Sequence, residues 1–233
     1  VPVLVPLDEA GRHDLSAMAA AVTAATTVLI VCTPNNPTGP AVTHAEVAAL
    51  LERVPPHVLV VLDEAYVEFV TAAGAPDSLA LWREHPNVVV LRTFSKAYGL
   101  AGLRVGYAVA HPPVAAALRK TAVPFGVNLI AQAAAVASLD ATDELFVRVK
   151  DLVAERDRVT DALRAQGWRL PDAQGNFVWF PLGPRSAEFA AVCQDAGLVV
   201  RPYGEDGVRV TVAEPEANDR LLRVAEQWLH DRT

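Results

Sequence analysis

Lys96 is the first residue of this sequence whose type points to chemistry. The chain has 20 basic residues, and only three are lysines: Lys96, Lys120 and Lys150. The chain therefore tends to use arginine where only a positive charge is needed, and a lysine in a special place is a candidate reactive group. Lys96 follows an apolar run and lies beside the hydroxyl groups of Thr93 and Ser95. A lysine amine there could form a Schiff base with an aldehyde.

Three short apolar runs each end in polar residues that a hydrophobic core does not need. The runs are Val28–Cys32, Val58–Leu62 and Val88–Leu91. The polar residues that follow them are Asn36 after the first, Asp63 and Tyr66 after the second, and Thr93, Ser95, Lys96 and Arg104 after the third. Continuous β-branched runs spaced by about 30 residues predict parallel strands buried on both faces. Because the carboxyl ends of such strands line a ligand crevice, we expect these side chains to meet at one edge.

This set of side chains fits one kind of cofactor. Thr93, Ser95 and Arg104 suit an anion, and Asp63 suits a protonated ring nitrogen. Asn36 and Tyr66 would hydrogen-bond a ring oxygen, and Lys96 would react with an aldehyde. Pyridoxal 5′-phosphate (PLP) carries all of these groups.

The rest of the chain predicts further elements around these strands. Val105–Val109 is expected to be an antiparallel strand, because only about a dozen residues separate it from the third run. Helices are expected at 14–24, after the capping-box-like segment Thr43–Glu46, and at 130–139. A long helix capped at Thr142 should end at Gly167, and its charged stretch 155–158 is expected to be solvated.

The final third has an α+β pattern of short strands and helices. Strands are expected at 177–180, 198–200 and 208–212, and helices at 186–196 and 216–231. We therefore expect two domains, an α/β large domain over residues 1–145 and a smaller α+β domain over residues 146–233.

Several motifs resemble one enzyme family across essentially the whole chain. They are NNPTG (Asn35–Gly39), DEAY (Asp63–Tyr66) and TFSKAYGLAGLRVGY (Thr93–Tyr107). Together they resemble the fold-type I PLP-dependent aminotransferases, in particular the histidinol-phosphate aminotransferase-like subgroup. With VRPYGEDGVRVTV (Val200–Val212), they are most similar to the actinobacterial aromatic amino acid (phenylalanine) aminotransferases of that subgroup.

The resemblance implies a role for each matching residue. Lys96 would form the Schiff base, and Asp63 would keep the pyridine nitrogen protonated. The cofactor would also contact Asn36, Tyr66, Thr93, Ser95 and Arg104. The substrate α-carboxylate would bind Arg209, with Asn176 nearby. The implied activity is transfer of an amino group from an aromatic amino acid to 2-oxoglutarate by a homodimeric cytoplasmic enzyme.

Alternatives to this interpretation remain open. Histidinol phosphate is the alternative amino donor. A receiver-like signalling domain also places an aspartate, a hydroxyl and a lysine at strand ends, and a PLP-fold protein without catalysis could be a binding module. Members of the family also have roughly a further third of chain before the position of Val1, so we expect an N-terminally truncated chain that holds an incomplete site.

Composition excludes other classes of function. The formal net charge of −7 does not suit nucleic acid as a partner. No apolar run reaches the roughly 18 residues of a membrane span. The six histidines lack ligand spacing, so we expect no metal site. Cys32 and Cys193 are distant in sequence, which suits a reducing compartment.

Overall fold

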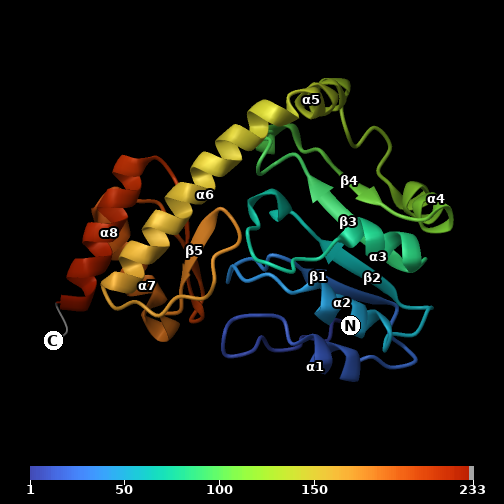
Figure 1. The fold of residues 1–233 in the computed structure, drawn as a ribbon, viewed down its shortest axis with the longest axis horizontal. Coiled ribbons are helices and arrows are strands. Elements are labelled where there is room, and N and C mark those ends of the chain that lie inside the picture. Colours follow the sequence, from blue (N-terminus) through green and yellow to red (C-terminus); the bar gives the residue numbers. More distant parts are fainter. Residues whose placement is uncertain (231–233) are drawn as a thin grey trace.

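The computed structural model describes residues 1–230, in which two β-sheets are joined by one long helix (Figure 1). The first sheet has the strand order β1-β2-β3-β4, with bounds Val28–Cys32, Leu59–Asp63, Val88–Thr93 and Gly106–Val109. Strands β1, β2 and β3 run parallel, whereas β4 is antiparallel to β3. The expected α/β fold with a mainly parallel sheet is thus confirmed, and the expected direction of the fourth strand is correct.

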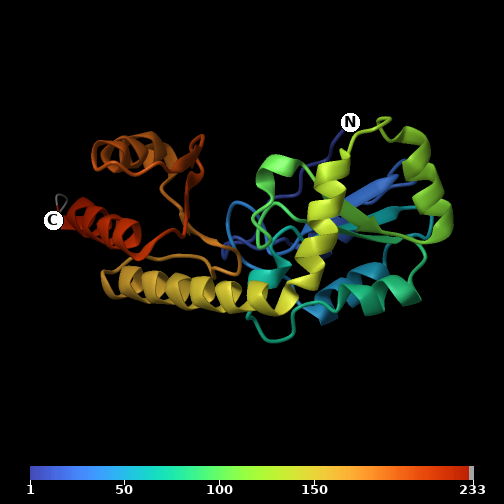
Figure 2. The ribbon, with the colours of Figure 1, turned by 90° about the horizontal axis from the view of Figure 1, so that it is seen from above.

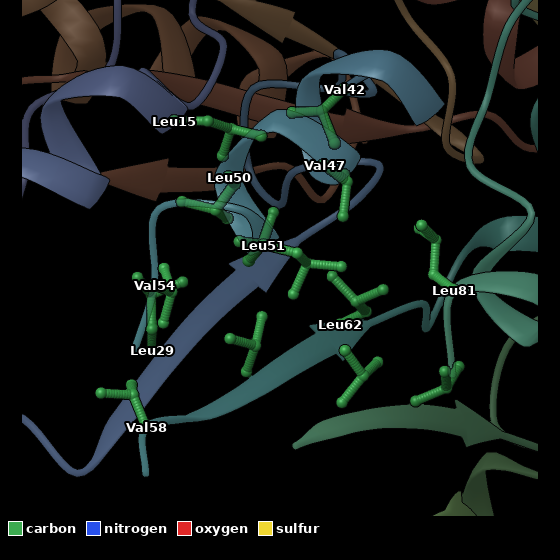
Figure 3. Close-up of a cluster of buried hydrophobic side chains, with 14 residues drawn as sticks. Leu15, Leu29, Val42, Val47, Leu50, Leu51, Val54, Val58, Leu62 and Leu81 are labelled. Carbon is green, nitrogen blue, oxygen red and sulfur yellow. The ribbon is translucent and has the colours of Figure 1, made fainter. Parts of the chain in front are cut away.

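Three helices cover one face of this sheet and form the main core. They are α1 (Leu15–Ala20), α2 (His44–Leu51) and α3 (Ser78–Glu84). Leucine and valine side chains from these helices and from β1, β2 and β3 pack together between the helices and the sheet (Figure 3). Helix α2 begins with the expected capping box, because the Thr43 hydroxyl accepts from Glu46 N and the Glu46 carboxylate accepts from Thr43 N at 2.7 Å.

The second sheet is antiparallel and has the order β5-β7-β6, with bounds Phe177–Phe180, Gly207–Thr211 and Arg201–Tyr203. Helices α7 (Ser186–Asp195) and α8 (Pro215–His230) pack with it. The expected strand at 198–200 is wrong, since the strand lies at 201–203. Leu198 N donates to Cys193 O at 2.8 Å, so this residue completes the end of α7. Leu198 and Val200 are apolar because they pack against the core.

Helices α4 (Pro112–Thr121), α5 (Leu129–Asp140) and α6 (Thr142–Ala165) follow the first sheet, and short 3₁₀ turns lie at Val67–Phe69, Ala101–Leu103 and Gly183–Arg185. Thr142 is the first residue of α6 and does not cap it, which corrects the expectation. The Thr142 hydroxyl instead donates to Leu139 O at 2.5 Å, and Ala141 takes the capping position without a side-chain bond.

Helix α6 runs from the first sheet to the second without a break (Figure 2). Near its start, Leu145 and Val149 pack in a cluster with Tyr66 and Phe69. Further along, Val159 and Leu163 belong to the core of the second sheet. One rigid element therefore contacts both halves of the molecule.

Apolar side chains are exposed on β1 and around α5. On β1, Val28 and Ile30 point away from α1 and α2, and Ile30 is 58% exposed. A band of exposed apolar residues also runs through the segment before α5 and the helix itself, with Phe125, Leu129 and Ile130. No helix in residues 1–230 is both long and apolar enough to cross a membrane. So much exposed apolar surface in one region is typical of a surface that binds other protein.

We expect the isolated 233-residue chain to self-associate through this band. Replacing Leu129 and Ile130 together with glutamate should shift the protein towards monomer, because charges would have to be desolvated at the contact. Sedimentation velocity at several concentrations measures the change. Gln194→Glu on α7 adds a charge without removing apolar surface, and it should leave association unchanged. Equal association of all three proteins would contradict the expectation.

Candidate functional site

Two predicted site residues lie where β2 and β3 end. Asp63 is the last residue of β2 and pairs in register with Cys32 of β1 and Leu91 of β3. Since side chains alternate across a strand and Leu62 faces the helical core, Asp63 lies on the opposite face of the sheet. Its Oδ1 atom accepts from Ala65 N at 3.2 Å. Thr93, the last residue of β3, accepts from Ser95 N at 3.0 Å.

Lys96 lies in the turn after β3 and approaches Tyr66 from the neighbouring strand end. Its Nζ atom is 5.2 Å from the centre of the Tyr66 ring, a cation–π distance. Gly99 N donates to Lys96 O at 3.0 Å and so holds the turn. Tyr66 is buried, whereas Lys96 is exposed. The amine therefore lies above a fixed aromatic ring.

The second sheet reaches this site through Phe177, which the sequence analysis did not single out. Its ring packs edge-on against Tyr66 with centroids 5.1 Å apart. Arg209 on β7 lies over the same ring, with Cζ 5.2 Å from its centroid. Lys96, Tyr66, Phe177 and Arg209 thus form a continuous series of contacts from the first sheet to the second.

Arg209 also contacts the loop after β1. Its Nη1 atom donates to Asn36 Oδ1 at 2.5 Å, a bond between residues 173 positions apart. Among residues 1–230, Arg209 Nε is buried and has no hydrogen-bond partner. A buried donor left without an acceptor is costly. An anionic ligand at this point would relieve that cost.

The loop that carries Asn36 is held from within and from the second half of the chain. Asn35 Nδ2 donates to Thr38 Oγ1 at 2.7 Å, and Thr38 Oγ1 donates to Gly11 O at 2.6 Å. Gly39 has φ of +105°, and a Cβ atom there would lie 2.9 Å from Asp172 O. A glycine is therefore required for this loop to approach the second half so closely.

Two further predicted site residues, Arg104 and Asn176, lie on segments whose positions are set by backbone conformation and hydrogen bonds. Arg104 follows a 3₁₀ turn in a left-handed conformation, and its Nη1 atom donates to Ala101 O at 2.7 Å. Asn176 immediately precedes β5, where its carbonyl accepts from Val212 N at 2.9 Å. Direct contacts therefore link Lys96, Tyr66, Phe177, Arg209 and Asn36. Ser95 and Asn176 neighbour Lys96 and Phe177 in the sequence, and Arg104 lies further along the loop after Lys96.

A buried ion pair that the sequence analysis did not identify stabilises the strand ends. Glu64 is 1% exposed, and its carboxylate accepts from Arg92 Nε at 2.7 Å and from the Ser78 hydroxyl. Burial raises the pKa of Glu64, although the bonds from Ser78 and Arg92 oppose that rise. Because Glu64 follows Asp63 and Arg92 precedes Thr93, the pair fixes the two strand ends relative to each other.

Cys32 ends β1 beside Asp63. Burial, followed by a smaller effect of the Asp63 charge, raises the pKa of its thiol to about 11. The thiol is therefore protonated near neutral pH and is a poor nucleophile there.

Comparison with known proteins identifies the family. A profile of aminotransferase class I and II matches residues 1–224. The chain belongs to the aminotransferase class I and II family. The aromatic amino acid aminotransferase of Streptomyces coelicolor is 63% identical over 226 residues, which are 97% of this chain and 63% of that protein. The enzyme of the same name from Mycolicibacterium smegmatis is 58% identical, over 98% of this chain and 63% of its own length.

Solved structures of this aminotransferase family share the fold. The histidinol-phosphate aminotransferase of Sinorhizobium meliloti, solved in complex with pyridoxal-5′-phosphate, has a TM-score of 0.86 and 30% identity. The match covers 99% of this chain and 65% of that one. A putative histidinol-phosphate aminotransferase from Erwinia carotovora has a TM-score of 0.89 and 25% identity, over 97% and 67% of the two chains. The chain thus spans about 63% of the length of the curated relatives named above.

We expect Arg92→Met to destabilise this aminotransferase chain strongly. The change leaves the Glu64 carboxylate buried without its cation, a situation that costs about 3–5 kcal/mol. Urea unfolding measures the loss, and Arg83→Met on the exposed side of α3 is the matched control. The double variant Glu64→Gln with Arg92→Met should recover part of the stability.

The loss of stability in Arg92→Met should also depend on pH. Since burial raises the pKa of Glu64, the folded state binds a proton more readily than the unfolded state does. The destabilisation should therefore be smallest below the unfolded pKa of about 4.3 and should grow as pH rises through the raised folded pKa. A loss that is the same at pH 5 and pH 8 would contradict this assignment.

Proposed function

We propose that the protein transfers the amino group of an aromatic amino acid to 2-oxoglutarate with PLP as cofactor. The observation that carries the proposal is the 63% identity to an enzyme named aromatic amino acid aminotransferase. The site geometry supports it, because an amine and a guanidinium with a free donor lie on one series of contacts where the two sheets meet.

The residues present fit PLP by the chemistry of their donors and acceptors. The carboxylate of Asp63 is the acceptor for the pyridine N–H, and Asn36 and Tyr66 are the partners for the ring oxygen. Thr93, Ser95 and Arg104 supply hydroxyl and guanidinium donors for the phosphate. When bound, PLP supplies an aldehyde that condenses with amines and a ring that withdraws electrons from the substrate.

Lys96 acts as the base of the reaction. Its Nζ atom takes the proton from the substrate Cα and later donates a proton. Tyr66 holds the amine over its ring at 5.2 Å, which restricts where the proton can be delivered. Asp63 stabilises the protonated ring nitrogen through its negative charge.

Arg209 binds and orients the substrate. A guanidinium can hold a carboxylate with two parallel hydrogen bonds, and this aligns the Cα–H bond with the amine. Its packing on Phe177 fixes the plane of the guanidinium. Asn176, beside β5, is proposed to contact the same carboxylate.

Histidinol phosphate is a second candidate donor, favoured by the fold match to histidinol-phosphate aminotransferase. That match has only 30% identity, compared with 63% for the aromatic enzyme. Histidinol phosphate also has no α-carboxylate for Arg209. The aromatic donor is therefore the better candidate.

We further propose a large domain over residues 1–145 and a small domain over residues 146–233, with the boundary inside α6. A homodimer is supported by the apolar band near α5, and two free cysteines suit work in the cytoplasm. The amino donor and the 2-oxo acid are the proposed small-molecule partners.

Lys96→Ala in the whole protein should abolish the covalent link to the cofactor. Wild-type protein incubated with PLP and then reduced with borohydride should carry the cofactor on the Lys96 peptide by mass spectrometry. The variant should carry none, and its transamination rate should fall by at least about 10³-fold, within the range that a general base contributes. Lys120→Ala on exposed α4 is the control and should behave as wild type. Near wild-type transamination in Lys96→Ala would refute the assignment.

Phenylalanine should be preferred to histidinol phosphate as amino donor. The expected ratio of kcat/KM is at least tenfold, equal to about 1.4 kcal/mol in the barrier. Steady-state assays of the whole protein with 2-oxoglutarate as acceptor measure both values. A tenfold preference for histidinol phosphate would overturn the proposed substrate.

A further inference from the structure

We propose that Arg156 is a positioning residue that sets where the carboxylate-binding half of the site lies relative to the cofactor-binding half. The inference rests on the proposed function, because it assigns Arg209 and Lys96 to the two halves. It concerns a side chain on α6 that lies away from the reacting groups.

Arg156 is buried in a place where the sequence predicts a solvated surface. It lies within the charged stretch 155–158, yet it is only 1% exposed, so the expected exposure is wrong for this residue. Its position on α6 falls between Val149, which packs with Tyr66, and Val159, which packs in the core of the second sheet. The guanidinium therefore lies at the junction of the two apolar clusters.

The guanidinium bonds to segments from both halves of the chain. Nη1 donates to Phe69 O at 2.8 Å and, more weakly, to Gly175 O at 3.4 Å. Nη2 donates to Thr71 Oγ1 at 3.0 Å. Asp157 supplies a carboxylate 2.9 Å from Nε and from Nη2. The charge is thus balanced, and its remaining donors are directed at two separate backbone segments.

Gln174 forms a second connection between the same two segments. Its Oε1 atom accepts from Thr71 N at 2.8 Å and from Ala72 N at 2.9 Å. Its Nε2 atom donates to Asp172 at 2.9 Å, and its own backbone N donates to Gly39 O at 3.1 Å. The segment before β5 is therefore bonded both to the segment after Tyr66 and to the loop that carries Asn36.

These two segments lead directly into the site. Phe69 lies three residues after Tyr66, and Gly175 directly precedes Asn176 and then Phe177. Since Arg209 packs on Phe177, a shift of the segment 174–177 would move Arg209. Asp63 and Thr93 belong to the first sheet and Lys96 lies in the turn after β3, so these residues would stay in place. Arg156 therefore affects the binding of the substrate carboxylate more than the binding of the cofactor.

Arg156→Met and Arg156→Lys in the whole protein test this inference, with Arg164→Met as the matched control. Arg164 lies on the same helix, is exposed, and forms a 3.8 Å ion pair with Asp161. Two dissociation constants are measured by absorbance or fluorescence titration: that of PLP, and that of 3-phenylpropanoate for the PLP-loaded protein. The second probe has the carboxylate and the ring of phenylalanine but no amine, so it cannot react.

We expect Arg156→Met to weaken 3-phenylpropanoate binding at least tenfold and PLP binding less than threefold. Arg156→Lys should restore part of the affinity, because it keeps a donor and the charge. Arg164→Met should match wild type in both titrations. A parallel loss of both affinities would indicate a merely structural role and overturn the inference, as would unchanged binding of both ligands.

Thr71→Val keeps the inference testable if Arg156→Met does not fold. It removes the acceptor of Arg156 Nη2 and leaves the buried charge in place. We expect a smaller loss of 3-phenylpropanoate affinity, about threefold, with PLP affinity unchanged. Unchanged 3-phenylpropanoate affinity in folded Thr71→Val would then overturn the inference. Failure of wild-type protein to bind PLP would instead refute the proposed function, so the two failures are distinguishable.

Discussion

The ring of Phe177 is the contact on which the organisation of the site depends. Tyr66 packs against it from the first sheet and Arg209 lies over it from the second. Without this shared ring, the groups proposed to contact the cofactor and the group proposed to contact the substrate would belong to separate units. Aromatic contacts of this kind contribute about 0.5–1.5 kcal/mol beyond the area that they bury. The larger effect is geometric, because one rigid ring fixes two polar side chains.

The junction between the halves combines apolar packing with buried polar groups, and each has a different effect. Leucine and valine side chains of α6 supply non-directional burial, which resists separation but tolerates small sliding movements. The hydrogen bonds of Arg156 and Gln174 are directional and tolerate little displacement. Helix α6 therefore holds the two halves together through its apolar side chains and fixes their relative position through the guanidinium of Arg156.

The strand ends could be predicted from the sequence, because the position of a polar residue after a buried run depends only on local pattern. Asp63 and Thr93 end their strands in this way. The roles of Phe177 and Gln174 could not be predicted, since they depend on contacts with residues about 100 positions away. The burial of Arg156 could have been predicted, because Arg156 continues the helical spacing of the buried residues Leu145 and Val149. The charged residues beside Arg156 instead favour a solvated surface, which is why the whole stretch is predicted to be exposed.

Arg104 shows how the demands of folding differ from those of its proposed role in ligand binding. Its φ angle of +54° lies in the left-handed region, where a residue with a Cβ atom costs roughly 1–2 kcal/mol relative to the ordinary conformation. Glycine would occupy this backbone without strain, but it has no charge to offer an anion. The turn thus carries an energetic penalty that the core beneath β3 and β4 must offset. Directed evolution for thermal stability alone would drift towards glycine here, and would lose the guanidinium without any visible change in the fold.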